Sequence, residues 1–213
     1  MSPLFLNIGI DLDNTIINYD DVLYELALQE SLILSSTLKL KKNIRNVIQA
    51  LSNGDREWQK LQSKIYGAQI HRAKLADGVK VFFKQAREYG AKIHVVSHKT
   101  IYSNLRRDVN FRDAAINWME KNSFFDTQGL ALSRDDIYFE DSRSDKVRRI
   151  CRLGCTHFID DLEETFYEDM FPMDTEKILY SKEARSSLEY MRHGIKFFST
   201  WEAINQYFFR QRL

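Results

Sequence analysis

The sequence predicts an α/β fold in which a doubly wound parallel sheet carries an inserted, all-helical segment. Two observations predict it. Short apolar runs alternate with amphipathic stretches along most of the 213 residues, which is typical of a parallel sheet covered by helices. One long stretch, residues 18–76, breaks this alternation and shows only helical periodicity. We therefore expect one α/β core with a helical insertion.

The first expected strand is the nearly continuous apolar run over residues 4–11, which ends in acidic residues. A run with so little alternation is typical of a parallel strand that is buried on both faces. Similar short runs recur along the rest of the chain. We expect further strands at Lys92–Ser97, Ile137–Phe139, His157–Ile159, Lys177–Tyr180 and Ile195–Phe198.

Helices are expected between these strands. Apolar residues recur at helical spacing from Val79 onward and again from Val147 onward, and the two stretches are followed by Gly90 and Gly154. Glycine is the preferred residue just beyond the end of a helix. The aromatic segment 201–208 also has helical core spacing, so it predicts a last helix and not a platform for stacking bases.

The insertion, residues 18–76, predicts a small helical domain. One helix is expected over residues 40–51, ending at Asn53 and Gly54. Asp55 then has the position of an N-cap for the next helix. The apolar face of that helix is formed by Trp58, Leu61 and Ile65.

The domain boundaries follow from these elements. We expect the α/β core to comprise residues 1–17 and 77–213, and the helical domain to comprise residues 18–76. No internal repeat or low-complexity segment is apparent.

Composition and charge exclude several classes of function. Lys and Arg total 31 against 30 Asp and Glu, a formal net charge of +1, so nothing global favours nucleic acid or an anionic membrane. The cysteines Cys151 and Cys155 cannot form a disulfide framework and lack the second ligand pair of a zinc site. No apolar run approaches the roughly 18 residues of a membrane-spanning helix. We expect a soluble, cytoplasmic protein.

Polar residues at the ends of three expected strands indicate a binding site. Asp11 and Asp13 follow the first strand, Ser97 ends the second, and Asp160 and Asp161 follow the fourth. Ligands of open α/β sheets bind beyond the carboxyl ends of the strands. Four carboxylates in such a crevice require a cation, and oxygen ligands without clustered His or Cys favour Mg²⁺.

A cation for an anionic ligand is expected near the same edge. Lys146 lies at the head of the helix that precedes the fourth strand, and with the Ser97 hydroxyl it would complete a site for a dianion. Arg143 is the alternative, because the segment also contains Arg148 and Arg149 and would ordinarily be a solvated helical face.

The ordered motifs resemble those of the haloacid dehalogenase (HAD) superfamily. They are Asp-x-Asp-x-Thr at residues 11–15, Ser97, Lys146, and the pair Asp160-Asp161, and together they span nearly the whole chain. The resemblance implies a Rossmann-like core with the first strand at its centre. It also implies that the helical insertion is a cap of the C1 type.

The resemblance also implies roles for individual residues. Asp11 would be the nucleophile and Asp13 the general acid and base. Thr15, Ser97 and Lys146 would bind phosphate. The Mg²⁺ ligands would be Asp11, Asp13, Asp160 and Asp161.

These roles predict a Mg²⁺-dependent phosphatase that hydrolyses a small-metabolite phosphomonoester through an aspartyl-phosphate. A phosphosugar, a nucleotide or a related ester would fit beneath a cap, whereas a macromolecular phosphate would not. Two alternatives stay open: a phosphomutase or phosphotransferase on the same scaffold, and a non-catalytic phosphate-binding regulatory protein. Dehalogenation is disfavoured, because Asp13 would have no role in displacing a halide from carbon.

Several further residues are weighed against structural roles. His98 and Lys99 follow Ser97 and are either substrate contacts or surface residues. His94 lies within a strand and is expected to be a core histidine. Three residues near the return from the insertion either contact a bound anion or form the solvated end of a helix, which is the simpler interpretation: His71, Arg72 and Lys74.

Overall fold

The computed structural model describes residues 5–103, 108–182 and 193–209. Contacts between residues divide the chain into two compact units, which we describe separately. The first unit is an α/β unit, and the second is helical. The first comprises Met1–Ile16, Leu75–Lys99 and Asn122–Leu213, and the second comprises Ile17–Lys74 and Thr100–Lys121.

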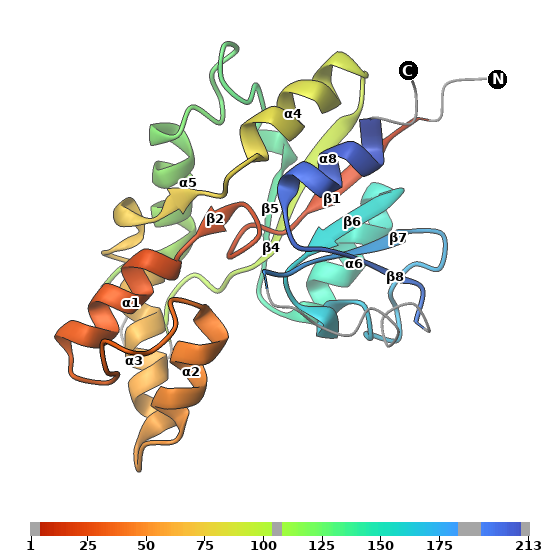
Figure 1. Cartoon of the computed structure of the whole chain (residues 1–213). Coiled ribbons are helices and arrows are strands. Elements are labelled where there is room, and N and C mark those ends of the chain that lie inside the picture. Colours follow the sequence, from red (N-terminus) through yellow and green to blue (C-terminus); the bar gives the residue numbers. More distant parts are fainter. Residues whose placement is uncertain (1–4, 104–107, 183–192, 210–213) are drawn as a thin grey trace. The chain divides into compact units, whose positions relative to one another are not determined.

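A six-stranded parallel sheet forms the centre of the α/β unit, with strand order β5-β4-β1-β6-β7-β8 (Figure 1). The predicted fold class and each expected strand are confirmed, although Leu4 at the start of the first run lies outside the described residues. The strands are β1 (Asn7–Ile10), β4 (Lys92–His98), β5 (Ile137–Glu140), β6 (His157–Asp160), β7 (Glu176–Tyr180) and β8 (Ile195–Phe198).

The register of the sheet brings the ends of three strands to one edge. Ile10, the last residue of β1, lies beside Val95 of β4 and Ile159 of β6. The next residue, Asp11, continues the pairing through its backbone N–H, which donates to the Ile159 carbonyl at 2.8 Å. The residues that follow β1, β4 and β6 therefore meet in the crevice where ligands of such sheets bind.

Helices cover the sheet of this unit (Figure 1). Helices α4 (Val79–Glu88) and α8 (Trp201–Phe209) pack together, with the ring centroids of Phe82 and Trp201 5.1 Å apart. Helix α6 (Arg143–Leu153) packs on β4 and β5. Both Val95 and Val96 on β4 are fully buried, as expected for a strand with two covered faces.

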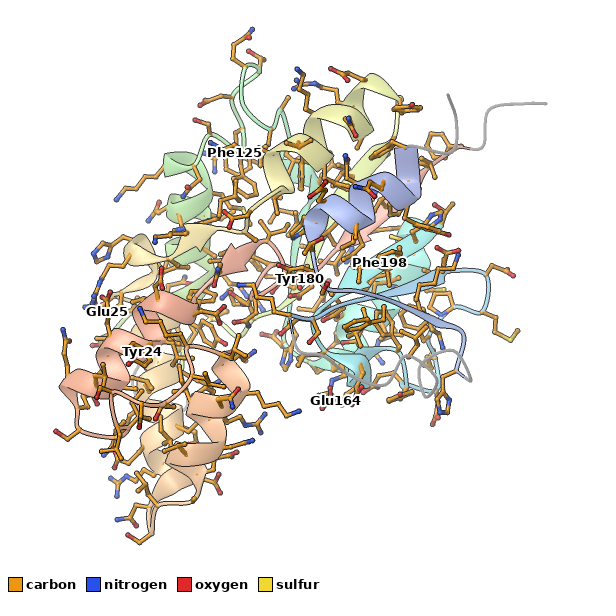
Figure 2. All side chains as sticks on the ribbon, in the orientation of Figure 1. Tyr24, Glu25, Phe125, Glu164, Tyr180 and Phe198 are labelled. Carbon is orange, nitrogen blue, oxygen red and sulfur yellow. The ribbon has the colours of Figure 1, made fainter. Side chains whose placement is uncertain are left out.

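Aromatic side chains complete the packing at the carboxyl end of the sheet. Tyr180 ends β7 and Phe198 ends β8, and both are labelled in Figure 2. The Tyr180 ring lies 5.8 Å from that of Trp201, and the Phe198 ring lies 5.4 Å from that of Tyr207. The aromatic last helix therefore belongs to the core, as its spacing predicts.

Two glycines set the ends of helices in this unit. Gly154 ends α6 with φ 63°, and its N–H donates to the Cys151 carbonyl at 3.0 Å, so the predicted C-cap is confirmed. Gly78 precedes α4 with φ 91°, and a Cβ there would lie 2.8 Å from the Trp201 Cβ. Only glycine combines this backbone conformation with so close an approach.

The helical unit contains α1 (Asp20–Gln29), α2 (Lys41–Gln49), α3 (Gly54–Tyr66) and α5 (Phe111–Lys121). The predicted apolar face of α3 is confirmed, because Trp58, Leu61 and Ile65 are buried. The N-cap prediction was wrong: α3 begins at Gly54, and Asn53, two residues before Asp55, has the N-cap position. Asp55 lies in the first turn and accepts a hydrogen bond from Gln49 at 2.8 Å.

Helix α5 groups with this unit, whereas the sequence-based boundaries place its residues in the core. Its buried Trp118 donates from Nε1 to the Ala73 carbonyl at 2.9 Å. The rings of Phe111 and Tyr66 lie 6.5 Å apart in an edge-to-face arrangement. Both partners are distant in sequence, so periodicity alone gives no indication of this grouping.

Two short strands, β2 (Ile17–Asn18) and β3 (Lys74–Leu75), pair where the chain leaves and rejoins the α/β unit. The sequence did not predict them, because two residues are too few to show an alternating pattern. Among the helices in the described ranges, none has the length and apolarity needed to cross a membrane.

Candidate active site

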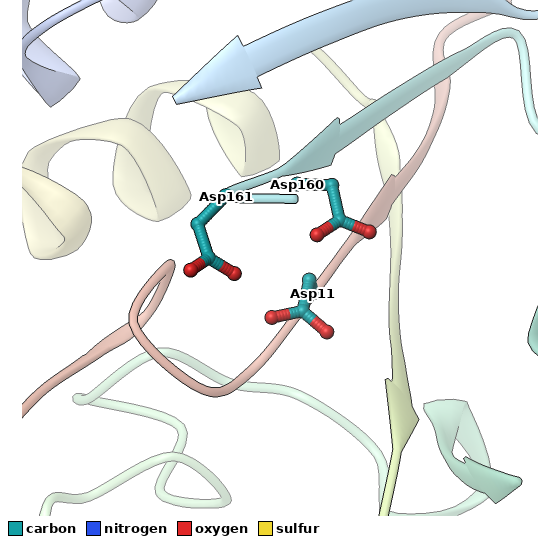
Figure 3. A group of neighbouring side chains, drawn as sticks. All are labelled: Asp11, Asp160 and Asp161. Carbon is teal, nitrogen blue, oxygen red and sulfur yellow. The ribbon is translucent and has the colours of Figure 1, made fainter. Parts of the chain in front are cut away.

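Three carboxylates converge at the carboxyl ends of β1 and β6 (Figure 3). Asp11 follows β1 and is buried, Asp160 ends β6 and is fully buried, and Asp161 is half-buried. One oxygen from each lies within 4.8 Å of the others. The structure thus brings together three of the four acids that the sequence singles out as metal ligands.

Lys146 lies against two of these acids. Its Nζ donates to Asp11 Oδ1 at 2.6 Å and to Asp160 Oδ2 at 2.8 Å, and its side chain is 3% exposed. Arg143, the alternative cation, is 40% exposed and lies 3.7 Å from Glu168. The structure therefore places Lys146, and not Arg143, among the carboxylates.

The first turn of α6 holds Lys146 in this place. Ser142 is the N-cap, and its side-chain oxygen accepts a hydrogen bond from the Asp145 N–H at 3.0 Å. Asp160 is fixed from its other side, because its Oδ1 accepts from the Leu162 N–H at 3.0 Å. The Lys146–Asp160 pair is therefore held locally at both ends, at Lys146 by the capped helix and at Asp160 by the turn to Leu162.

The buried charges shift one another's pKa. Burial has the largest effect on Asp11 and raises its pKa; Lys146 lowers it, and Asp160 and Asp161 raise it again, so that it lies at about 8. For Lys146, burial acts to lower the pKa, but Asp11 and Asp160 raise it above the usual lysine value. The cluster therefore favours additional positive charge.

Asp13 has a different environment. It is not part of the three-carboxylate group found among the described residues. Its Oδ2 lies 2.7 Å from Nζ of Lys99, whose side chain is 3% exposed. The sequence grouped Asp13 with the metal ligands, whereas the structure pairs its side chain with a lysine.

Lys99 is the site residue whose importance the sequence did not reveal. The available signal was the two-residue repeat of a strand, which puts Lys99 on the same side as Ser97. The intervening His98 is exposed, and its Nε2 lies 3.2 Å from the Asp141 carbonyl. Lys99 is thus buried beside the site, while His98 lies at the surface.

Two buried hydroxyls have no hydrogen-bond partner in the described part of the chain. Thr15 Oγ1 and Ser97 Oγ make no hydrogen bond to any described residue, and burying a polar group in this way costs free energy unless a ligand satisfies it. The backbone of Thr15 is held firmly, because its carbonyl accepts from Trp201 Nε1 at 3.0 Å. Both hydroxyls belong to the motifs that the sequence assigns to phosphate.

Comparisons with known proteins identify the fold. No protein-family model matches the chain, and no curated protein does. Among solved structures, a haloacid dehalogenase-like hydrolase from Streptococcus pneumoniae matches 96% of this chain and 98% of its own, with TM-score 0.61 and 13% identity. The chain has the HAD fold.

Two further solved structures are similar to this chain over nearly its whole length. A family IA HAD hydrolase from Entamoeba histolytica has TM-score 0.57 and 12% identity, covering 93% of this chain and 95% of its own. A HAD family hydrolase from Deinococcus radiodurans, solved with bound phosphate and sodium, has TM-score 0.55 and 11% identity, covering 97% and 96%. In this chain, as the resemblance implies, the HAD core has β1 at its centre and helices inserted after it.

The donor set of this HAD-like site fits a divalent cation. Asp11, Asp13, Asp160 and Asp161 carry four negative charges when ionised, and Lys99 and Lys146 carry two positive charges. One divalent cation would balance the two negative charges that remain. The donors near the cluster are oxygens, which hard cations prefer. The three converging carboxylates can therefore hold a metal ion.

The remaining candidate residues contact other residues of the protein. His94 is buried, with its Nδ1 3.0 Å from Asp136. The side chains of His71, Arg72 and Lys74 each make a contact within the helical unit. His71 Nδ1 lies 2.9 Å from the Ala68 carbonyl, Arg72 pairs with Glu25, and Lys74 pairs with Asp21.

Proposed function

We propose that this chain is a Mg²⁺-dependent phosphatase that hydrolyses the phosphomonoester of a small metabolite through an aspartyl-phosphate on Asp11. The observation that carries the proposal is the buried Asp11 carboxylate, held by Lys146 beside two further acids, with Asp13 two residues away. The bound phosphate of the Deinococcus radiodurans structure supports it.

In the first step, a carboxylate oxygen of Asp11 attacks phosphorus. The new bond from this oxygen to phosphorus forms as the bond to the ester oxygen breaks, and Asp13 gives its proton to the departing alcohol. In the second step, Asp13 takes a proton from water, the water oxygen attacks phosphorus, and the bond to Asp11 breaks. The products are inorganic phosphate and the restored carboxylate.

Other residues of the site hold the phosphoryl group. Lys146 supplies a fixed positive charge, and the Ser97 and Thr15 hydroxyls, which bond to no described residue, supply hydrogen bonds to the phosphoryl oxygens. Mg²⁺, held by Asp11, Asp160 and Asp161, would offset the repulsion between the anionic nucleophile and the phosphate and would orient both.

The substrate class follows from the proposed cap. We assign residues 18–76 to a C1-type cap, which would exclude water during the first step and admit it for the second. A substrate enclosed in this way is a small ester, such as a phosphosugar or a nucleotide, and not a phosphorylated macromolecule.

The test is turnover of p-nitrophenyl phosphate with and without Mg²⁺. We expect EDTA to abolish turnover and Asp11→Asn to lower kcat by about 10³-fold or more, because the nucleophile is lost. Asp169→Asn, which changes an exposed acid of the same unit, should leave kcat unchanged.

Two outcomes would contradict the proposal. Metal-independent turnover, or full activity in Asp11→Asn, would remove the mechanism. Phosphate binding without turnover would favour a non-catalytic regulatory protein. If turnover is found, a panel of metabolite phosphates with and without a second alcohol acceptor identifies the substrate and separates hydrolysis from phosphotransfer.

A further inference from the structure

Lys99 is a buried lysine that the proposed mechanism leaves without a role. Its side chain is 3% exposed, and its Nζ lies 2.7 Å from Asp13 Oδ2. Lysines are almost never fully buried unless they are paired, because the ammonium loses its hydration. The sequence left Lys99 open as a substrate contact or a surface residue, and its burial excludes the surface interpretation.

The backbone around Lys99 is fixed by the sheet. Lys99 directly follows β4, and its N–H donates to the carbonyl of Glu140, the last residue of β5, at 2.9 Å. Ser97, two residues earlier, is also buried, while His98 between them is exposed. The strand alternation therefore directs Lys99 and Ser97 to the same side, and the hydrogen bond to β5 holds the Lys99 backbone there.

The two buried lysines of the site contact different acids. Lys146 donates to Asp11 and Asp160, and Lys99 pairs with Asp13. The nucleophile therefore has its own cation, and Lys99 acts on the residue that moves the proton. A lysine needed only for neutralising the metal-binding acids would not be expected at this position.

We propose that Lys99 is a positioning residue for Asp13, an inference that rests on the proposed function. An ammonium-to-carboxylate hydrogen bond is short and strong, so it fixes the rotation of the Asp13 carboxyl group. Because Oδ2 faces an ammonium donor, a proton on Asp13 resides on Oδ1. Lys99 thereby selects which oxygen exchanges a proton with the leaving alcohol and with water.

This role differs measurably from two others. If Lys99 instead bound the phosphoryl group, or only supported the fold, its loss would affect all phosphate esters alike. A residue that positions the general acid matters most when the leaving group needs a proton. Phenolate is a strong base and leaves slowly without protonation, whereas p-nitrophenolate is a weaker base and leaves readily.

The experiment measures kcat/KM for phenyl phosphate and p-nitrophenyl phosphate in Lys99→Met. The value of kcat/KM depends only on the steps up to departure of the alcohol, so the later attack by water does not affect it. We expect a loss of about 100-fold on phenyl phosphate and less than about tenfold on p-nitrophenyl phosphate, within the usual range for general acid catalysis. Lys99→Arg should recover part of the loss.

The experiment on Lys99→Met includes a matched control variant and a comparison with Asp13→Asn. Lys92→Met removes an exposed lysine, 53% accessible, from the first position of the same strand, and should leave both ratios unchanged. Asp13→Asn should show the same selectivity for the leaving group. Adding Lys99→Met to Asp13→Asn should cause little further loss, because the two residues act as a unit.

The outcomes separate this inference from the proposed function. Equal losses on both esters, or no loss on either, would overturn the positioning role while leaving the phosphatase standing. Absence of Mg²⁺-dependent turnover in the wild type would overturn the phosphatase itself, and the role of Lys99 with it. If Lys99→Met does not fold, as shown by circular dichroism, the same two-ester comparison with Lys99→Arg decides the matter.

Discussion

Two ion pairs of equal length, one in each unit, differ in their surroundings. Lys146 Nζ lies 2.6 Å from Asp11 in the α/β unit, with the side chains 3% and 8% exposed. Lys64 Nζ lies 2.6 Å from Glu30 in the helical unit, with the side chains 44% and 25% exposed. The distances are the same, but water screens only the second pair effectively.

The difference extends beyond these two pairs. The α/β unit places charged groups inside the protein at the carboxyl end of its sheet, as Lys99 and Asp160 also show. Pairs in the helical unit lie nearer to solvent, for example Lys74 with Asp21, with side chains 71% and 51% exposed. Glu25, labelled on α1 in Figure 2, has an exposed side chain paired with Arg72. Buried charges are costly, so they mark the α/β unit as the candidate for a functional site.

Among these changes, Lys146→Met should have the largest effect on the free energy of unfolding. It leaves Asp11 and Asp160 buried without their cation, so we expect a loss of about 3–5 kcal/mol in the free energy of unfolding. The measurement is urea denaturation of the metal-free protein. A loss below about 1 kcal/mol would show that the buried pair behaves like a surface pair, and the distinction between the two units would fail.

Added Mg²⁺ should stabilise the wild type by about 2.7 kcal/mol at a concentration 100 times its Kd. The ion would relieve repulsion among Asp11, Asp160 and Asp161 in the folded state. The measurement is the melting temperature as a function of Mg²⁺ concentration. Asp161→Asn should weaken the response, whereas Glu30→Gln in the helical unit should retain it. An equal response in both variants would place the ion elsewhere.

The pKa of Asp11, raised from 3.8 to about 8, predicts a pH dependence for the metal-free protein. A raised pKa in the folded state contributes stability that is complete below about pH 4 and is lost as pH rises through about 8. Between pH 5 and 9 in EDTA, the wild type should therefore lose stability relative to Asp11→Asn. Asparagine retains an oxygen that can accept from Lys146. If the melting temperatures of the two proteins changed equally between pH 5 and 9, this would contradict the raised pKa of Asp11.

Lys64→Met should have the smallest effect. Double-mutant cycles on exposed pairs give about 0.2–1 kcal/mol, so we expect a change of less than about 1 kcal/mol in the free energy of unfolding. Urea denaturation under the conditions used for Lys146→Met checks this directly. A loss as large as that of Lys146→Met would indicate that the exposed fraction of a pair does not set its importance here.

The parts of the fold that the sequence predicted depend on local pattern. Apolar runs identified the strands of the sheet, most clearly β1, because a strand buried on both faces shows little alternation. Gly154 identified the end of α6 because a left-handed residue favours glycine. The motif around Asp11 was recognisable because its residues are adjacent in sequence.

What the sequence could not predict depends on partners far apart in the chain. The Lys99–Asp13 pair joins residues after two different strands, and neither position alone indicates burial. Trp118 similarly binds Ala73 in the helical unit, a contact that periodicity of α5 does not reveal. The N-cap of α3 was predicted at Asp55, whereas Asn53 has this position in the structure.

The hydrogen bond from Trp201 Nε1 to the Thr15 carbonyl joins residues 186 positions apart. During synthesis the loop that contains Asp11 and Asp13 leaves the ribosome 186 residues before the indole that fixes its backbone. At typical rates of about 5–20 residues per second, the loop waits roughly 10–40 seconds for this partner. Asp11 and Asp13 are therefore made well before the residue that fixes their loop.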